Sequence, residues 1–240
     1  MRWFTVSIVV ALATLAALSA SETPAALEYE VVAVKRQLLL ATGDGERELQ
    51  AGDIAKSGDS LRTGSRSRAE LEVADQGARF VVASKTRFRL AHERPGVLLE
   101  IERGSLRAIF GKLSEGEDRE RLVTTPSAVL AVRGTEYGVE VQKDGDTSVT
   151  VFEGTVEVWE VGGVGERIRV QAGQQARIRK GRAPSAPRPH GLTSDDWDRG
   201  HRKSSSAMGA MGRSPGMGAG AQQGSGGSQS RQGGSKKHGG

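Results

Sequence analysis

The chain has 240 residues, a formal net charge of +5 and no cysteine. The lack of cysteine excludes disulfides and a cysteine-linked lipid anchor, so a folded domain must be stabilised by packing. The positive charge is uneven, because residues 183–240 carry eight Lys or Arg residues against three Asp residues. The preceding part of the chain therefore offers no argument for a basic, nucleic-acid-binding domain surface.

The N-terminal segment has the pattern of a secretory signal peptide. Arg2 precedes an apolar run over residues 3–18, and small side chains follow it. That order is typical of exported proteins. We expect a signal peptide over residues 1–20, a mature N-terminus between Ala20 and Glu22, and a periplasmic or secreted protein. The alternative is an uncleaved anchor, for which the run is shorter than the ~20 residues that span a bilayer.

Residues 28–181 are expected to form one all-β domain. Apolar and polar residues alternate in short runs, for example over residues 69–73 and 153–159. Such alternation predicts strands with one packed face and one solvated face. Asp144-Gly145 is typical of a tight turn between two strands. The fold class that follows is an antiparallel β-sandwich or β-roll of many short strands.

Two segments of the expected domain resemble each other. Residues 101–108 and 151–158 both begin with apolar residues, pass through a Gly-Ser or Gly-Thr step and then resume alternation. A weak repeat of this kind indicates stacked hairpins, as in a sandwich or a roll, and does not choose between them.

The strand pattern stops after Gly181. Residues 182–240 are rich in Pro, Gly and Ser with scattered cations, and they hold too few apolar side chains to offset the entropy of ordering. We expect a flexible basic tail with a disordered Gly-rich end, dispensable for folding. Within it, residues 193–200 have the pattern of a short helix capped by Thr193 or Ser194, stable only if Trp197 docks on the domain.

Three motifs follow one another along the chain. Residues 58–64 read GDSLRTG, residues 124–137 read TTPSAVLAVRGTEY and residues 151–156 read VFEGTV. Together they resemble the FecR-type domain, the periplasmic module named after iron-dicitrate sensor proteins, roughly from Asp53 to Ala176. The resemblance implies a module that binds a partner or a ligand, without catalytic chemistry.

The resemblance also implies a comparison with the iron-dicitrate sensors. In those relatives, a cytoplasmic sigma-factor-regulating segment and a membrane helix precede the domain, and an outer-membrane receptor contacts it. Only Met1 and Arg2 precede the apolar run of this sequence. We therefore expect a stand-alone exported form.

The motif residues are expected to serve the fold rather than a ligand. Glycines in such positions take positive φ at corners, and Leu61 is expected to fill the core. Arg133 is expected to be buried, with its guanidinium on an acceptor such as Asp59, Glu136 or Glu153. The motif residues are Gly58, Asp59, Leu61, Arg62, Thr63, Gly64, Thr125, Pro126, Arg133, Gly134, Thr135, Glu153 and Gly154.

No catalytic or metal-binding pattern is evident. His92 is the one histidine of the expected domain, so a Ser/His/Asp triad would depend on it. The HExxH and CxxC patterns do not occur. An acidic segment resembles a calcium cluster but lacks EF-hand order and fits a solvated loop better; its members are Glu115, Glu117, Asp118 and Glu120. We expect no enzyme, no cofactor and no metal.

The function that the sequence favours is an exported, non-catalytic FecR-like binding module that engages a protein partner or an envelope ligand such as a glycan. One alternative is a structural envelope protein loosely attached to anionic glycan through its basic tail. A distant alternative is a hydrolase that uses His92. Nucleic acid is not expected as a partner, because no aromatic residue follows Trp197 for base stacking. No stable membrane span is expected after signal cleavage.

Overall fold

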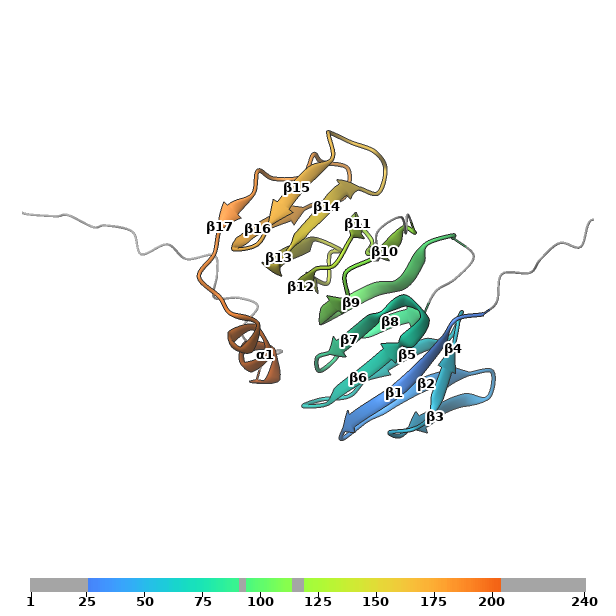
Figure 1. The fold of residues 1–240 in the computed structure, drawn as a ribbon. Helices are drawn as coiled ribbons and strands as arrows, with labels where there is room; N and C mark the ends of the chain where they lie inside the picture. The colour runs from blue at the N-terminus through green and yellow to red at the C-terminus, as the bar shows by residue number, and fades with distance from the viewer. Residues whose placement is uncertain (1–25, 91–93, 114–118, 204–240) are drawn as a thin grey trace, which may run out of the picture. The chain divides into compact units, whose positions relative to one another are not determined.

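The computed structural model describes residues 26–90, 94–113 and 119–203. These residues form many short strands, one 3₁₀ turn η1 (Ala74–Gln76) and one helix α1 (Ser194–Lys203) (Figure 1). The strands are β1 (Glu28–Lys35), β2 (Leu38–Thr42), β3 (Gly45–Leu49), β4 (Ile54–Lys56), β5 (Ser60–Thr63), β6 (Arg68–Val73), β7 (Ala78–Val82), β8 (Arg87–Leu90), β9 (Val97–Phe110), β10 (Arg121–Thr124), β11 (Ala128–Val132), β12 (Glu136–Val141), β13 (Thr147–Glu153), β14 (Thr155–Glu160), β15 (Ile168–Gln171), β16 (Gln174–Ile178) and β17 (Arg188–Pro189).

Strand pairing arranges these strands in two layers that share β9. Layer A has the order β4-β1-β6-β7-β9-β12-β13-β16-β17. Layer B has the order β3-β2-β5-β8-β9-β10-β11-β14-β15. The expected all-β class is confirmed. Every pairing is antiparallel except that of β9 with β10, which is parallel.

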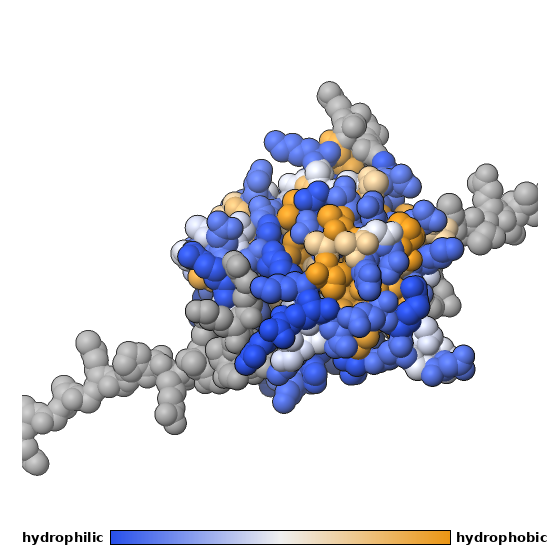
Figure 2. Space-filling model, turned by 90° about the horizontal axis from the view of Figure 1, so that it is seen from below, coloured by the Kyte–Doolittle hydropathy of each residue, from blue (hydrophilic) through white to orange (hydrophobic). Residues whose placement is uncertain are grey.

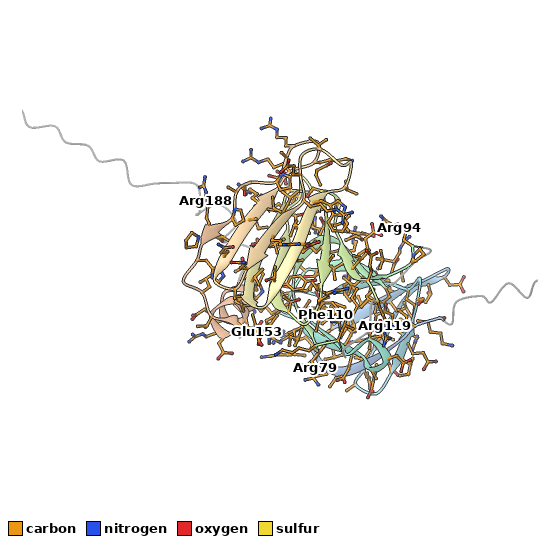
Figure 3. The ribbon with its side chains drawn as sticks, turned by 45° about the horizontal axis from the view of Figure 1, so that its top comes forward. Arg79, Arg94, Phe110, Arg119, Glu153 and Arg188 are labelled. Atoms are coloured by element: carbon orange, nitrogen blue, oxygen red, sulfur yellow. The ribbon has the colours of Figure 1, made fainter. Side chains whose placement is uncertain are left out.

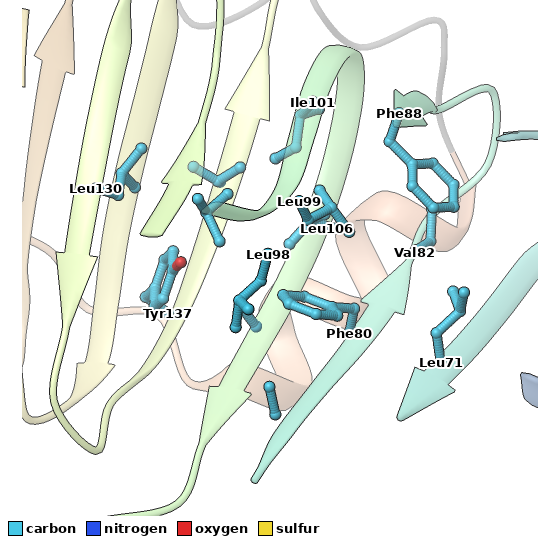
Figure 4. Close-up of a cluster of buried hydrophobic side chains, with 14 of the residues drawn as sticks. Leu71, Phe80, Val82, Phe88, Leu98, Leu99, Ile101, Leu106, Leu130 and Tyr137 are labelled. Atoms are coloured by element: carbon cyan, nitrogen blue, oxygen red, sulfur yellow. The ribbon is translucent and has the colours of Figure 1, made fainter. Parts of the chain in front are cut away.

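The core lies between the layers and comes from the alternation of each strand. In β6, Ala69, Leu71 and Val73 are buried while the charged residues between them are partly exposed. Side chains from both layers join in a single apolar cluster (Figure 4). Phe110 belongs to this cluster, with its ring 5.8 Å from that of Phe80 in an edge contact and 6.1 Å from that of Tyr137 in a stacked one.

The chain crosses between the layers again and again, and a residue with positive φ occupies nine of these crossings. Six of the nine are glycine, which takes such backbone angles at little cost. This back-and-forth winding is the connectivity expected of a β-roll rather than of two separately folded sheets. The crossing residues are Arg36, Gly52, Gly58, Arg66, Lys85, Gly104, Gly134, Gly154 and Gly173.

Gly104 is the crossing within β9. Residues before it pair with β8 and β10 in layer B, and residues after it pair with β7 and β12 in layer A. Its φ is +106°, and a Cβ there would lie 2.5 Å from the Cα of Thr86. Thr86 is fully buried, and its Oγ1 accepts a hydrogen bond from the Ser105 N–H and donates one to the Ser105 carbonyl, both at 3.0 Å. The bend is therefore fixed by backbone angle and close packing together.

The structure differs from the expected tail boundary at Gly181. The short strand β17 pairs with β16, and α1 packs on layer A, with Trp197 only 5% exposed. Residues up to 203 thus belong to the folded unit, because Trp197 does dock. The expected signal peptide and residues 204–240 lie outside the described residues. Within the described ranges, no helix has the length and apolarity needed to cross a membrane.

Replacement of Gly104 by alanine tests the bend. We expect Gly104→Ala to lower the free energy of unfolding by about 3 kcal/mol, because it adds backbone strain and a clash with Thr86. Gly77→Ala is the matched control, since Gly77 also has positive φ, +53°, but open space around its Cβ position. The control should cost only about 1 kcal/mol. Denaturant melts that give equal losses for both would contradict this role of Gly104.

Candidate functional site

The first FecR-like motif forms the corner between β4 and β5. Gly58 donates its N–H to the Leu90 carbonyl, and the Asp59 carboxylate accepts the Lys56 N–H at 2.9 Å. Leu61 is buried in the core, as expected. These contacts stabilise the corner and join it to β8.

The second half of this motif joins β5 to its neighbours. Thr63 donates its hydroxyl to the Ala83 carbonyl at 2.6 Å. A Cβ on Gly64 would lie 2.7 Å from the side-chain oxygen of Gln37. Arg62 faces solvent and pairs with Glu46 of β3. Thr63 and Gly64 thus serve packing, and Arg62 lies on the surface.

The Arg-Gly-Thr and Glu-Gly motifs meet in one corner. Gly134 and Gly154 have φ of +78° and +79°, and each lies where the chain crosses between layers. A Cβ on Gly154 would lie 2.6 Å from the Gly134 carbonyl oxygen and 2.7 Å from a methyl carbon of Thr135. A Cβ on Gly134 would lie 2.9 Å from the Cα of Lys112. Two motifs distant in sequence are therefore halves of one packed corner, beside which Glu153 is exposed (Figure 3).

Thr125 organises a third corner through buried hydroxyl groups. Its Oγ1 accepts the Ala128 N–H at 2.9 Å and lies 2.7 Å from the Thr147 hydroxyl. Ser127 donates to Thr147 at 2.8 Å, which links the turn before β11 to β13. Pro126 lies against the turn at Gly145. This cluster is fully buried apart from Pro126, so it holds strands together and offers no ligand site.

Arg133 does not occupy the buried position expected of it. Its side chain is exposed, although neighbouring Val132 and Thr135 are buried. The alternation of β11 ends at Val132, so the chain has already entered the corner when it reaches Arg133. The expectation that the Arg133 guanidinium lies in the interior was wrong.

The buried guanidinium of the described residues belongs to Arg121, which is 2% exposed. It donates to the carbonyls of Gln76 and Gly111 at 3.0 and 2.9 Å, and it lies 5.2 Å from the ring centre of Phe110. Burial lowers the pKa of Arg121. The available signal was period two, because Arg121 shares its face of β10 with the core residue Val123.

The two arginines give a paired prediction. Arg121→Ala leaves two carbonyls without their donor and removes the contact with Phe110, so the free energy of unfolding should fall by about 3 kcal/mol. Arg133→Ala, at an exposed position, should change it by less than about 0.5 kcal/mol. Denaturant melts of both variants against the parent measure the difference. Equal losses, or a larger loss for Arg133→Ala, would contradict this assignment.

A second kind of site lies on the outer face of layer A, beneath α1. Gly138 of β12 has no side chain, and Trp197 lies on it so closely that a Cβ there would be 2.6 Å from Cζ2 of the indole. Phe152 of β13 meets the indole at 6.0 Å, and His201 stacks on it at 4.0 Å. We call this surface, formed by Gly138, Phe152 and the charged residues around them, the α1 site.

Charged groups surround the aromatic contact. Asp198 accepts hydrogen bonds from Arg68 at 2.7 Å and from Arg107 at 2.9 and 3.2 Å. Arg107 also donates to Glu136 at 2.6 Å. Burial alone would raise the pKa of Asp198, but the hydrogen bonds from the two guanidinium groups outweigh it and hold the pKa below its usual value. The carboxylate thus stays ionised in the contact.

His201 is the last of the ionisable groups around the aromatic contact. One ring nitrogen lies 2.8 Å from the Trp197 carbonyl oxygen and the other 3.6 Å from the Glu140 carboxylate. Burial opposes protonation, but Glu140, the Trp197 carbonyl and Asp198 together raise the pKa of His201 above its ordinary value.

Thr193, one of the two residues expected to cap the helix, forms its N-terminal cap. Its hydroxyl accepts the Asp196 N–H at 3.1 Å, while Asp196 accepts the Thr193 N–H at 3.2 Å. This reciprocal pair is a capping box, which fixes where α1 begins.

A small second apolar cluster lies outside the main core. Val97, Leu122, Val129, Ala131 and Trp159 form an apolar row on the outer face of layer B. The guanidinium of Arg167 lies 4.1 Å above the Trp159 ring. Figure 2 shows a further face on which apolar residues gather near the middle, enclosed by hydrophilic ones.

The described residues hold no group of three or more His, Asp or Glu residues placed to bind a metal. Asp144 accepts the Asp146 N–H, as in an ordinary turn. His92 and three of the four acids of the expected solvated loop, Glu115, Glu117 and Asp118, lie outside the described residues.

Comparison with known proteins agrees with the motifs. Residues 59–157 match the family model described as FecR protein. The chain thus has a FecR-type segment over residues 59–157. Its corners at Gly134 and Gly154 lie within the matched segment, and α1 lies beyond it.

Two solved structures are similar at low identity. Both are crystal structures of a putative anti-sigma factor from Parabacteroides distasonis ATCC 8503, at 2.50 and 1.65 Å resolution. Each has a TM-score of 0.45 and 16% identity, and the match covers 55% of this chain and 59% of the other. The chain thus spans less than two thirds of the length of these neighbours. No curated protein matches the chain.

The raised pKa of His201 gives the contact of α1 a pH dependence. The stabilisation by His201 should be fully present below about pH 6.5, the ordinary pKa of histidine, and should be lost as pH rises through the raised value. The pKa of Asp198 is lowered and that of Arg107 is raised, so both groups keep their charge across that range.

We therefore expect the stability difference between the parent and His201→Gln to be larger at about pH 5.5 than at about pH 8.5. Denaturant melts at the two pH values measure it. A difference that is the same at both, or that grows with pH, would show that His201 does not contribute through its charge.

Proposed function

We propose that this protein is an exported, non-catalytic FecR-type binding module that engages a protein partner. The match of residues 59–157 to the FecR family is the observation that carries the proposal. FecR-type relatives have regulatory or sensing roles, for which a protein partner is the natural ligand.

The positions of the motif residues support a scaffold rather than a reaction centre. Gly134, Thr135 and Gly154 pack against one another, and Thr125 lies within a buried hydroxyl cluster. Surfaces beside these corners, such as that around Arg133, are exposed and held rigidly by them. A well-packed corner that presents exposed side chains suits recognition of a partner, because little conformational entropy is lost on binding.

Site-specific crosslinking in the envelope of the producing cells tests the proposal. A photoreactive residue is placed at Arg133 beside the motif corner, at Arg167 beside the apolar row and at Gly163 as a control with open surroundings. We expect a discrete protein adduct from Arg133 or Arg167, absent from Gly163, on a chain whose mature N-terminus lies between Ala20 and Glu22.

Three outcomes would overturn the proposal. An intact Met1 in the envelope fraction would refute export with cleavage. Absence of a discrete protein adduct at every position, with the chain retained only on glycan and released by salt, would favour a structural envelope protein instead. Turnover of an ester or amide substrate that is abolished by His92→Ala would establish a hydrolase.

A further inference from the structure

The α1 site combines an aromatic slot with a paired cationic cradle. The slot consists of Gly138, which leaves room for a ring, and the edge of Phe152. The cradle consists of Arg68 and Arg107, whose guanidinium groups converge on a single carboxylate, that of Asp198. An aromatic side chain followed directly by an acid, on one turn of helix, fits both parts.

Helix α1, which occupies this surface, has little helical stability of its own. Helix α1 has 10 residues, and isolated helices shorter than about 12–15 residues are marginal in water. Gly200 within it lowers helix propensity further. The chain between β16 and α1 is held to the sheet by the two residue pairs of β17 and by hydrogen bonds of Ser185 and His190, and none of these contacts involves α1 itself. The contacts of Trp197, Asp198 and His201 therefore decide whether the helix stays docked.

We propose that the α1 site is a recognition site for a short helix of a partner protein that presents an aromatic residue followed by a carboxylate, and that α1 occupies it in cis until such a helix displaces it. Charge complementarity carries this choice of partner. When α1 leaves, two guanidinium groups face solvent with Glu136 as a counter-ion to one of them. The inference rests on the proposed partner-binding function and names the surface that performs it.

The competition between cis and trans helices sets the affinity to be measured. A tethered segment acts at an effective concentration on the order of 1 mM. If α1 is docked about ten to one, the same helix added in trans should bind the open site with a Kd of about 0.1 mM or tighter. The docked form should weaken this apparent affinity about tenfold.

A synthetic peptide of residues 190–203, blocked at both ends, is the probe. Binding is followed by calorimetry to three full-length proteins: the parent, Trp197→Ala and the double variant Gly138→Ala/Trp197→Ala. We expect a Kd of about 0.1 mM or tighter for Trp197→Ala, binding about tenfold weaker for the parent, and none for the double variant, whose new methyl group fills the slot. Gly138 has an ordinary strand backbone, so alanine there should leave layer A intact.

Two matched peptides sharpen the result. A peptide with Gly200→Ala should bind more tightly, because this position has open space and alanine favours the helix. A peptide with Trp197→Ala should not bind. Asp198→Asn provides a second release variant of the protein, in case Trp197→Ala does not fold. Absence of peptide binding to both folded release variants overturns the inference.

A photoreactive residue at Ser148 separates this inference from the proposed function. Ser148 pairs with Glu140 across β12 and β13, so it borders the α1 site. We expect a partner adduct at Ser148 in the Trp197→Ala protein, suppressed by excess peptide. Adducts at Arg133 or Arg167 without one at Ser148 would overturn the inference and leave the function standing. An adduct at Ser148 that joins two copies of this chain would show that α1 of one copy binds the α1 site of another. That result would overturn the proposal of a partner helix.

Discussion

The fold depends on one constraint, namely that the chain must turn between two sheet layers every few residues without leaving a gap in the core. Nine of the crossings have a residue with positive φ, and at Gly104, Gly134 and Gly154 another segment also approaches closely. Gly104 meets both needs within β9, the strand that belongs to both layers. Because β7, β8, β10 and β12 all pair with β9, an error at this bend would displace strands in both layers at once.

The need for positive φ at the crossings between the layers also explains why the FecR-like motifs are rich in glycine. Gly58, Gly134 and Gly154 are three of the layer crossings, and the last two press against each other. The weak repeat of residues 101–108 and 151–158 has the same origin. Its shared glycines, Gly104 and Gly154, both stand where the chain leaves one layer for the other. The glycines of the motifs therefore meet a requirement of the fold.

Alternation predicted the strands well and the corners poorly. Residues 69–73 form most of β6, since a run with one apolar face has only one way to lie on a core. Residues 153–159 have an equally regular pattern, yet the structure divides them at Gly154, so that β13 lies in layer A and β14 in layer B. Period two cannot reveal such a break, because the alternation resumes after the turn.

The two arginines show a related limit. Arg121 and Arg133 each adjoin a strand with buried apolar residues, and one side chain is buried while the other is exposed. The Arg121 guanidinium has acceptors in the carbonyls of Gln76 and Gly111, and Gln76 is 45 residues away in sequence. Desolvation of a guanidinium is favourable only where such acceptors converge, and no local pattern contains that information.

Helix α1 extends this point to function. Composition predicts that the segment cannot fold alone, since its residues are polar and its length is short. It is ordered because Gly138, a residue with no side chain, leaves an aromatic slot on an otherwise polar sheet face, and because Arg68 and Arg107 need a carboxylate. Order that depends wholly on a complementary surface can be exchanged for another segment with the same complementarity. For that reason the proposed partner helix is assigned to the outer face of layer A rather than to the motif corners.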